Sequence, residues 1–396
     1  MFSYKERVDK LINDELAAGQ IAGANLLVIK DGEEKFFSSY GQMDMENGKE
    51  MKRDTIFRMF SMSKPVTAAA VMILQERGEI DLRDEVSKYL PEYHGQKVWT
   101  ENGLVDAERD ITIWDCLNMT TGIPYPHPWS EVGIQMDDLF KELIQARTCG
   151  NSPDTREYVR RIAEIPLEFQ PGKKWMYGLS ADILGAVVEV VSGKKYGQFL
   201  QEEIFGPLGM VDTGFFVPEE KKDRFAKLYN YDEEQGSLVH FEESHLGEYY
   251  GEDVQFESGG AGLVSTIDDY SKFAQMMVNK GIYNGVRILG EKTVEFMTQN
   301  RLADDQREDF CWDSTKGYGY GCLMRILEDQ GVAGTIGDIG EYGWDGWTGN
   351  YVTMNPKENM VFLYYIQKCG AGFTGLTRKL RDVTYANLQE FRTKRF

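Results

Sequence analysis

Apolar side chains recur with the period of an α-helix in several stretches of the chain. Residues 1–20 form an amphipathic pattern, and VTAAAVMILQERGEI carries the i, i+3, i+4, i+7 stripe of a buried helix that ends near Gly78. The segments SADILGAVVEVVSG and IDDYSKFAQMMVNKG repeat this pattern and end at Gly193 and Gly281. A last helix is predicted from Leu376 to Phe391, with shorter ones in TIWDCLNM and MDDLFKELIQA. Helices should therefore dominate the middle of the chain.

Strand signals concentrate at the two ends. ANLLVIKDGEEKFFSSYG is predicted to form two strands around an Asp31-Gly32 turn, a strong hairpin signal. In the last third, GYGYGCLMRILE, GWTGNYVTMNP and ENMVFLYYIQ are predicted strands separated by Gly and Pro. The Gly-rich run 317–321 is expected to be a turn that enters a strand, and the strand around Gly343 is expected to lie at a sheet edge.

One architecture accommodates both patterns. We expect an α/β fold of the α+β type, with an antiparallel sheet built from both chain ends, flanked by helices, and an inserted helical lobe. The predicted unit is a single domain, 1–396, with an α/β lobe of approximately 1–95 plus 300–396 and a mainly helical lobe of approximately 96–299. A ligand cleft is expected between the sheet and the helical lobe.

Composition narrows the possible partners. The 396 residues include 44 Lys+Arg and 64 Asp+Glu, a formal net charge of −20. Because so acidic a surface repels phosphate backbones and anionic lipids, we expect neither a nucleic-acid nor a membrane partner. The five cysteines are odd in number, scattered and without CxxC, which favours a reducing compartment. With no apolar signal core at the start and no apolar run of ~18 residues, a cytoplasmic location is predicted. The sequence leaves the oligomeric state open.

Several common catalytic motifs are missing from the sequence. HExxH, zinc-type Cys/His spacing, GxSxG and GxxxxGK[ST] do not occur, and there are only four histidines. We therefore expect neither a metal nor an organic cofactor.

The segment FSMSKP, residues 60–65, carries the strongest chemical signal. Ser61 and Lys64 are three residues apart at the start of a buried helix, so their side chains share one face. Burial and the positive potential of the helix N-terminus both favour a neutral lysine, which can activate the serine without a histidine. A second S-x-x-K, Ser192/Lys195, lies at the end of a predicted helix and lacks this setting. From these residues alone, Ser61 could also be a helix N-cap and Lys64 a surface lysine.

Two further segments favour catalysis. Tyr177 precedes a buried helix beside Gly178, and a tyrosine close to a lysine can be held as a phenolate or relay a proton. In GEYGWDGWTGNYVTMNP, the glycines would let the backbone approach a ligand, as an oxyanion donor on a strand facing Ser61 must. A packed aromatic ring and a plain hairpin are the alternative interpretations.

Five segments, in order, resemble the serine β-lactamase/penicillin-binding-protein superfamily. The similarity is greatest to its class C-like branch, which includes the family VIII carboxylesterases. The segments are DTIFRMFSMSKPVTAAAVMILQERGEIDLRDEVSKYLPEY, ITIWDCLNMTTGIPY, FQPGKKWMYGLSADILGAVVEVVSGKKYGQFLQEEIFGPLGM, ESGGAGLVSTIDDYSKFAQMMVNKG and GEYGWDGWTGNYVTMNPKENMVFLYYIQ. The resemblance implies a β-lactamase/transpeptidase-like fold and a serine hydrolase.

The resemblance also assigns residue roles. It implies Ser61 as nucleophile, Lys64 as its general base or proton shuttle, and Tyr177 as the partner base and acid. Backbone N–H groups of Ser61 and Trp347 would form the oxyanion hole. The segment 344–346 stands where β-lactamases carry K-T-G and the esterase branch carries W-G-G. The implied substrate-binding residues are Tyr125, Trp129, Leu179, Trp344, Asp345 and Gly346. For the loop that holds Tyr125, His127 and Trp129, a proline-pinned loop packed by aromatic rings is the alternative.

Departures from the family pattern bear on the substrate. Leu179 replaces the asparagine of cephalosporinases, and no lysine occupies the K-T-G position, which favours an esterase-type pocket over a β-lactamase. Asp345 is unusual for W-G-G; it could face solvent or select a cationic or hydroxylated substrate. The leading hypothesis is a serine hydrolase that cleaves small esters or amides through an acyl-enzyme on Ser61. The alternatives are a β-lactamase or D-amino-acid-specific peptidase, an acyltransferase, or a degenerate protein that only binds an acyl ligand.

Overall fold

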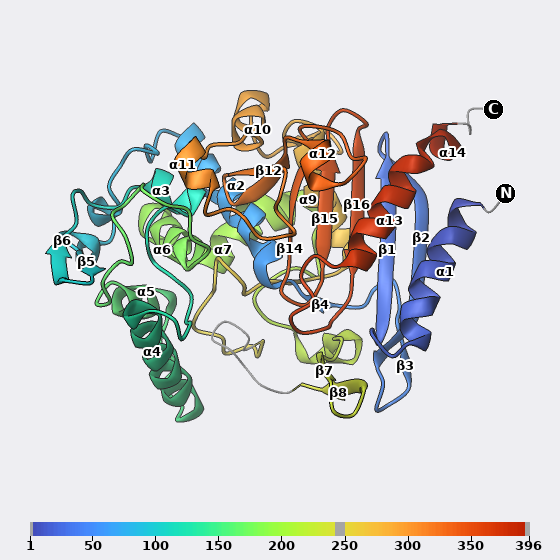
Figure 1. The fold of residues 1–396 in the computed structure, drawn as a ribbon, viewed down its shortest axis with the longest axis horizontal. Helices are drawn as coiled ribbons and strands as arrows, with labels where there is room; N and C mark the ends of the chain where they lie inside the picture. Colours follow the sequence, from blue (N-terminus) through green and yellow to red (C-terminus); the bar gives the residue numbers. More distant parts are fainter. Residues whose placement is uncertain (1–2, 242–249, 393–396) are drawn as a thin grey trace.

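An eight-stranded antiparallel sheet forms the centre of the protein. The computed structural model describes residues 3–241 and 250–392 (Figure 1). The sheet order is β12-β13-β14-β15-β16-β1-β2-β3. The N-terminal strands are β1 (Gly23–Lys30), β2 (Glu33–Asp44) and β3 (Lys49–Glu50). The C-terminal strands are β12 (Tyr318–Gly321), β13 (Met324–Leu327), β14 (Tyr342–Asp345), β15 (Tyr351–Asn355) and β16 (Met360–Tyr365). Since β1 pairs with both β2 and β16, the predicted antiparallel sheet built from both chain ends is confirmed.

Two tight turns set the hairpins of the sheet, and the sequence predicted only the first of them. Asp31 and Gly32 have φ values of 55° and 75°, as the tight turn between β1 and β2 requires, so this predicted hairpin is confirmed. The strand predicted in GYGYGCLMRILE is instead two strands, because Cys322 and Leu323 adopt φ values of 46° and 62° and reverse the chain. This extra hairpin supplies the sheet edge, so the expectation that β14 is an edge strand was wrong.

Helices cover both faces of the sheet. On one face lie α1 (Tyr4–Ala17), α13 (Gly375–Ala386) and α14 (Leu388–Arg392), so the two ends of the chain meet there (Figure 1). The last helix predicted from the sequence is divided at Asn387 into α13 and α14. On the opposite face lie α9 (Ile267–Val278) and α2 (Ser63–Glu76), and α6 (Ser180–Ser192) packs against α2. The positions of these three helices agree with the predicted apolar stripes. The α2 side chains are buried continuously from Ser63 to Leu74, which makes this helix the centre of the larger core.

Further helices and strand pairs complete the fold. The remaining helices are α3 (Ile113–Asn118), α4 (Glu131–Thr148), α5 (Thr155–Ile162), α7 (Tyr196–Leu200), α8 (Gly206–Leu208), α10 (Glu291–Met297), α11 (Asp304–Arg307) and α12 (Gln330–Ala333). The small antiparallel pairs are β4 (Phe57–Arg58) with β9 (Val264–Ser265), β5 (Lys97–Thr100) with β6 (Gly103–Asp106), β7 (Tyr229–Asp232) with β8 (Ser237–His240), and β10 (Ile282–Tyr283) with β11 (Val286–Arg287). Within the described residues, no helix is both long enough and apolar enough to cross a membrane. The two lobe boundaries stay a prediction.

Candidate active site

Ser61 lies in a strained turn that leads into α2. This turn, the 3-10 segment η1 (Phe60–Met62), directly precedes the helix that the sequence predicted to begin at the serine. Phe60 has a φ of 46°, a left-handed conformation that costs an L-residue about 1–2 kcal/mol. Its ring packs edge-on against Trp347, with centroids 5.4 Å apart. Such strain is maintained where the surrounding packing demands it, and it is common at functional sites.

Lys64 reaches Ser61 as the three-residue spacing predicted. Its Nζ lies 3.1 Å from Ser61 Oγ, 3.0 Å from the Tyr125 hydroxyl and 2.8 Å from the Gly260 carbonyl oxygen. The lysine is fully buried, and this desolvation lowers the pKa of its amine from 10.5 to about 7, although the carboxylate of Asp182 acts in the opposite direction. A large fraction of the amine is therefore neutral near pH 7 and able to accept a proton.

Tyr177 faces the same lysine. The Lys64 Nζ is 4.6 Å from the centroid of its ring, and its hydroxyl accepts a hydrogen bond of 3.1 Å from Trp344 Nε1. Burial raises the pKa of the phenol above its usual value, while hydrogen bonds to Ser61 and Trp344 act to lower it. The neutral phenol is thus the favoured form, which suits a proton relay better than a standing phenolate.

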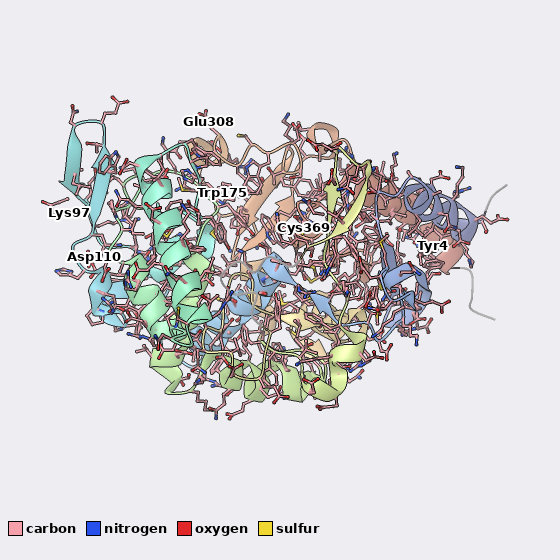
Figure 2. The ribbon with its side chains drawn as sticks, turned by 90° about the horizontal axis from the view of Figure 1, so that it is seen from below. Tyr4, Lys97, Asp110, Trp175, Glu308 and Cys369 are labelled. Atoms are coloured by element: carbon pink, nitrogen blue, oxygen red, sulfur yellow. The ribbon has the colours of Figure 1, made fainter. Side chains whose placement is uncertain are left out.

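Aromatic rings enclose this tyrosine. Trp175, labelled in Figure 2, lies between helical segments and the C-terminal strands, and its ring centroid is 6.2 Å from that of Tyr177. Further rings within 5.6 Å of Tyr177, centroid to centroid, belong to Tyr125, Trp312 and Trp344. The wall beside the Ser61–Lys64 pair is therefore largely apolar.

Residues 344–346 play three different structural parts. Trp344 binds the Tyr177 hydroxyl, whereas the Asp345 carboxylate is ion-paired with Arg325, with Nη1 to Oδ1 at 2.5 Å. A Cβ atom on Gly346 would lie 2.5 Å from the Met59 carbonyl oxygen, so only glycine lets this strand end pass so close to the turn that holds Ser61. The Gly346 N–H is bonded to the Asn350 carbonyl at 2.7 Å.

The other residues singled out from the sequence lie in different settings. Tyr125 accepts a hydrogen bond from Lys64, whereas Leu179 is buried in the core at the start of α6. Trp129 is 79% exposed and stacks on His127, with ring centroids 4.4 Å apart. Trp347 is at the surface above η1, and the oxyanion role of its N–H stays a prediction.

Sequence reasoning missed a second group beneath the lysine. Asp182 in α6 accepts hydrogen bonds from Ser258 Oγ (2.5 Å) and from the Gly260 N–H (3.1 Å). The sequence did hold a signal for this group: Asp182 is a carboxylate within the apolar helix SADILGAVVEVVSG, and a buried charge needs hydrogen-bond or charged partners.

Among the residues that the structure describes, no group of three or more His, Cys, Asp or Glu side chains could hold a metal ion. Cys116, Cys149, Cys311 and Cys322 are free thiols.

A serine within hydrogen-bond distance of a buried lysine three residues later matches the S-x-x-K motif of β-lactamases and penicillin-binding proteins. The Beta-lactamase family model matches residues 8–384, and the chain belongs to this family with its β-lactamase/transpeptidase-like fold. It is 30% identical to the esterase EstB of Burkholderia gladioli, over 97% of this chain and 96% of EstB.

Solved structures agree with this assignment. EstCE1, described as a hydrolase with promiscuous acyltransferase activity, superimposes with a TM-score of 0.81 and 25% identity, over 96% of this chain and 98% of EstCE1. Simvastatin synthase LovD from Aspergillus terreus has a TM-score of 0.80 over 98% of this chain and 100% of LovD, and its 22% identity bears on the fold alone.

Proposed function

We propose that the protein is a carboxylesterase-like serine hydrolase that cleaves small esters or amides through an acyl-enzyme on Ser61. One observation carries the proposal: the amine of the fully buried Lys64 lies 3.1 Å from Ser61 Oγ and has a pKa of about 7. A neutral amine at hydrogen-bond distance is what a serine needs to lose its proton as it attacks.

The residues of the cluster account for each step. Ser61 Oγ attacks the carbonyl carbon, and its proton passes to Lys64 or is relayed through Tyr177. The N–H of Ser61, in the first turn of η1 where helical N–H groups lack partners, and the N–H of Trp347 would stabilise the oxyanion. Tyr177 or Lys64 returns the proton to the leaving group, and water then releases the acyl product.

The surroundings favour an ester over a β-lactam. Trp344 and Leu179 stand where a β-lactamase would carry charged and amide groups to bind the lactam, and the adjoining wall is aromatic. The similarity to the esterase EstB supports the same choice.

Hydrolysis of p-nitrophenyl acetate and butyrate tests this proposal. Ser61→Ala should abolish turnover. Ser192→Ala, which alters the second S-x-x-K, is the matched control and should retain it. Ser192 Oγ lies at the end of α6, where it donates to the Val188 carbonyl and accepts from the Lys194 N–H. Equal turnover by wild type and Ser61→Ala would refute the nucleophile assignment. A wild type inert toward esters but active on nitrocefin or a D-alanyl peptide would replace the esterase with a β-lactamase or peptidase.

Acyl transfer is the second candidate, supported by the similarity to EstCE1. Adding 1-butanol to the ester assay distinguishes the two. Formation of the butyl ester at the expense of free acid would indicate an acyltransferase, whereas free acid alone would indicate a hydrolase.

A further inference from the structure

A buried carboxylate lies behind the Ser61–Lys64 pair. Asp182 is 2% exposed and comes from α6, the helix packed beside α2. Its Oδ1 accepts hydrogen bonds from two groups of one loop, the Ser258 hydroxyl at 2.5 Å and the Gly260 N–H at 3.1 Å. Both donors are neutral, so these bonds position the carboxylate without balancing its charge.

Gly260 links this carboxylate to the lysine. Its N–H binds Asp182, and its carbonyl oxygen accepts from Lys64 Nζ at 2.8 Å. A Cβ atom at position 260 would lie 2.8 Å from Asp182 Oδ2 and 3.2 Å from the Tyr125 hydroxyl. The space between the carboxylate, the loop and the lysine is therefore closed, and the loop transmits the position of Asp182 to the amine.

The charges around the pair leave Asp182 as the available counter-charge. Two carboxylates act on Lys64, but Asp345 is already paired with the Arg325 guanidinium at 2.5 Å. Burial raises the pKa of the Asp182 carboxyl, whereas the hydrogen bond from Ser258 and the charge of Lys64 act to lower it. Within residues 3–241 and 250–392, the other titratable groups that face Lys64 or Asp182 are the phenols of Tyr93, Tyr125, Tyr158, Tyr177 and Tyr196. Burial raises the pKa of each of these phenols, so they carry no charge at neutral pH.

We propose that Asp182 is a positioning residue that holds the Gly260 carbonyl against Lys64 and provides the counter-charge for the ammonium formed when Ser61 gives up its proton. An ammonium in a closed, apolar site is costly unless it is paired and hydrogen-bonded. Asp182 supplies the opposite charge, and the Gly260 carbonyl oxygen supplies the hydrogen-bond acceptor. The catalytic consequence rests on the proposed esterase function, whereas the effect on the Lys64 amine does not.

An NMR titration of 13C-lysine-labelled protein tests the electrostatic part without any substrate. Lys64→Arg assigns the Lys64 resonance. Asp182→Asn keeps the Oδ1 acceptor but removes the charge, so the pKa of Lys64 should fall by about one pH unit. Asp115→Asn is the matched control. Asp115, in α3, is equally buried at 2% exposed but is ion-paired with Arg109, so Lys64 should titrate as in the wild type. If Asp182→Asn does not fold, Asp182→Thr serves as the charge-neutral variant. An unchanged or raised Lys64 pKa in the charge-neutral variant would overturn the proposal.

The pH profile of kcat/KM for the ester tests the catalytic part. Because the free amine is the active form, the acid limb of the Asp182→Asn profile should move to lower pH by the same amount as the NMR pKa. Asp182→Ala should in addition lower the plateau by about 10- to 100-fold, because the Gly260 carbonyl is released. A shifted NMR pKa with an unmoved acid limb would overturn the catalytic role. A wild type that hydrolyses no ester would refute the proposed function while leaving the NMR result decisive for Asp182.

Discussion

Replacing Lys64, the proposed general base, by methionine should abolish activity and yet stabilise the protein at acidic pH. Lys64 is fully buried, and its amine has a pKa of about 7 in the fold against 10.5 for an unburied lysine. Between these two values the unfolded chain binds more protons than the native one, so the lysine's contribution to stability rises with pH through that window. Below pH 7 both states are protonated, and the burial penalty is fully present.

The size of the effect follows from the difference between the two pKa values. At 1.36 kcal/mol per pH unit, the penalty is about 5 kcal/mol at pH 6 and about 2 kcal/mol at pH 9. Methionine leaves the Gly260 carbonyl without its lysine partner, which costs about 1–3 kcal/mol at either pH. Relative to the wild type, Lys64→Met should therefore gain about 3 kcal/mol more stability at pH 6 than at pH 9.

Urea unfolding of both proteins at the two pH values provides the measurement. Lys30→Met is the matched control: Lys30 is 5% exposed, but its Nζ lies 3.1 Å from Glu358 Oε2. Breaking that ion pair should lower the free energy of unfolding at both pH values. The reasoning fails if Lys64→Met is less stable than the wild type at pH 6, or if its advantage is the same at pH 6 and pH 9.

Three further substitutions test other parts of the site. Tyr177→Phe removes the proton relay but keeps the ring packing, so kcat for p-nitrophenyl butyrate should fall by about 10²- to 10⁴-fold with little change in melting temperature; an unchanged kcat would exclude the relay. Arg325→Met leaves the Asp345 carboxylate unpaired and should lower the free energy of unfolding in urea by about 3–5 kcal/mol. The double variant Arg325→Met/Asp345→Leu should recover most of this loss, and additive losses from the two substitutions would contradict the pairing. Gly346→Ala places a methyl group 2.5 Å from the Met59 carbonyl oxygen, so the free energy of unfolding should fall by about 1–3 kcal/mol and kcat/KM should fall as well. Wild-type values of both would show that the close contact between residues 346 and 59 is not needed.

Features encoded within a few residues could be predicted from the sequence. Ser61 and Lys64 meet because helical geometry brings positions three apart to one face, whatever surrounds them. The Asp31-Gly32 turn follows from residues that tolerate positive φ, and α2 and α6 follow from the period of their apolar side chains. The hairpin between β12 and β13 could not be predicted in this way, since Cys322 and Leu323 have no preference for the φ values that the turn imposes on them.

Contacts between distant segments depended on the tertiary structure. The Lys64–Gly260 bond joins residues 196 apart in sequence, and the Trp344–Tyr177 bond joins residues 167 apart. No local pattern specifies such pairs, because they arise from how helices pack on the sheet. The same holds for Asp345, whose ion pair with Arg325 depends on the neighbouring strands β13 and β14. The sequence by itself thus determined that Ser61 and Lys64 meet, through short-range geometry. Only the tertiary structure decided the burial and charges around them, and with these the proton affinity of Lys64, because both depend on segments brought together by folding.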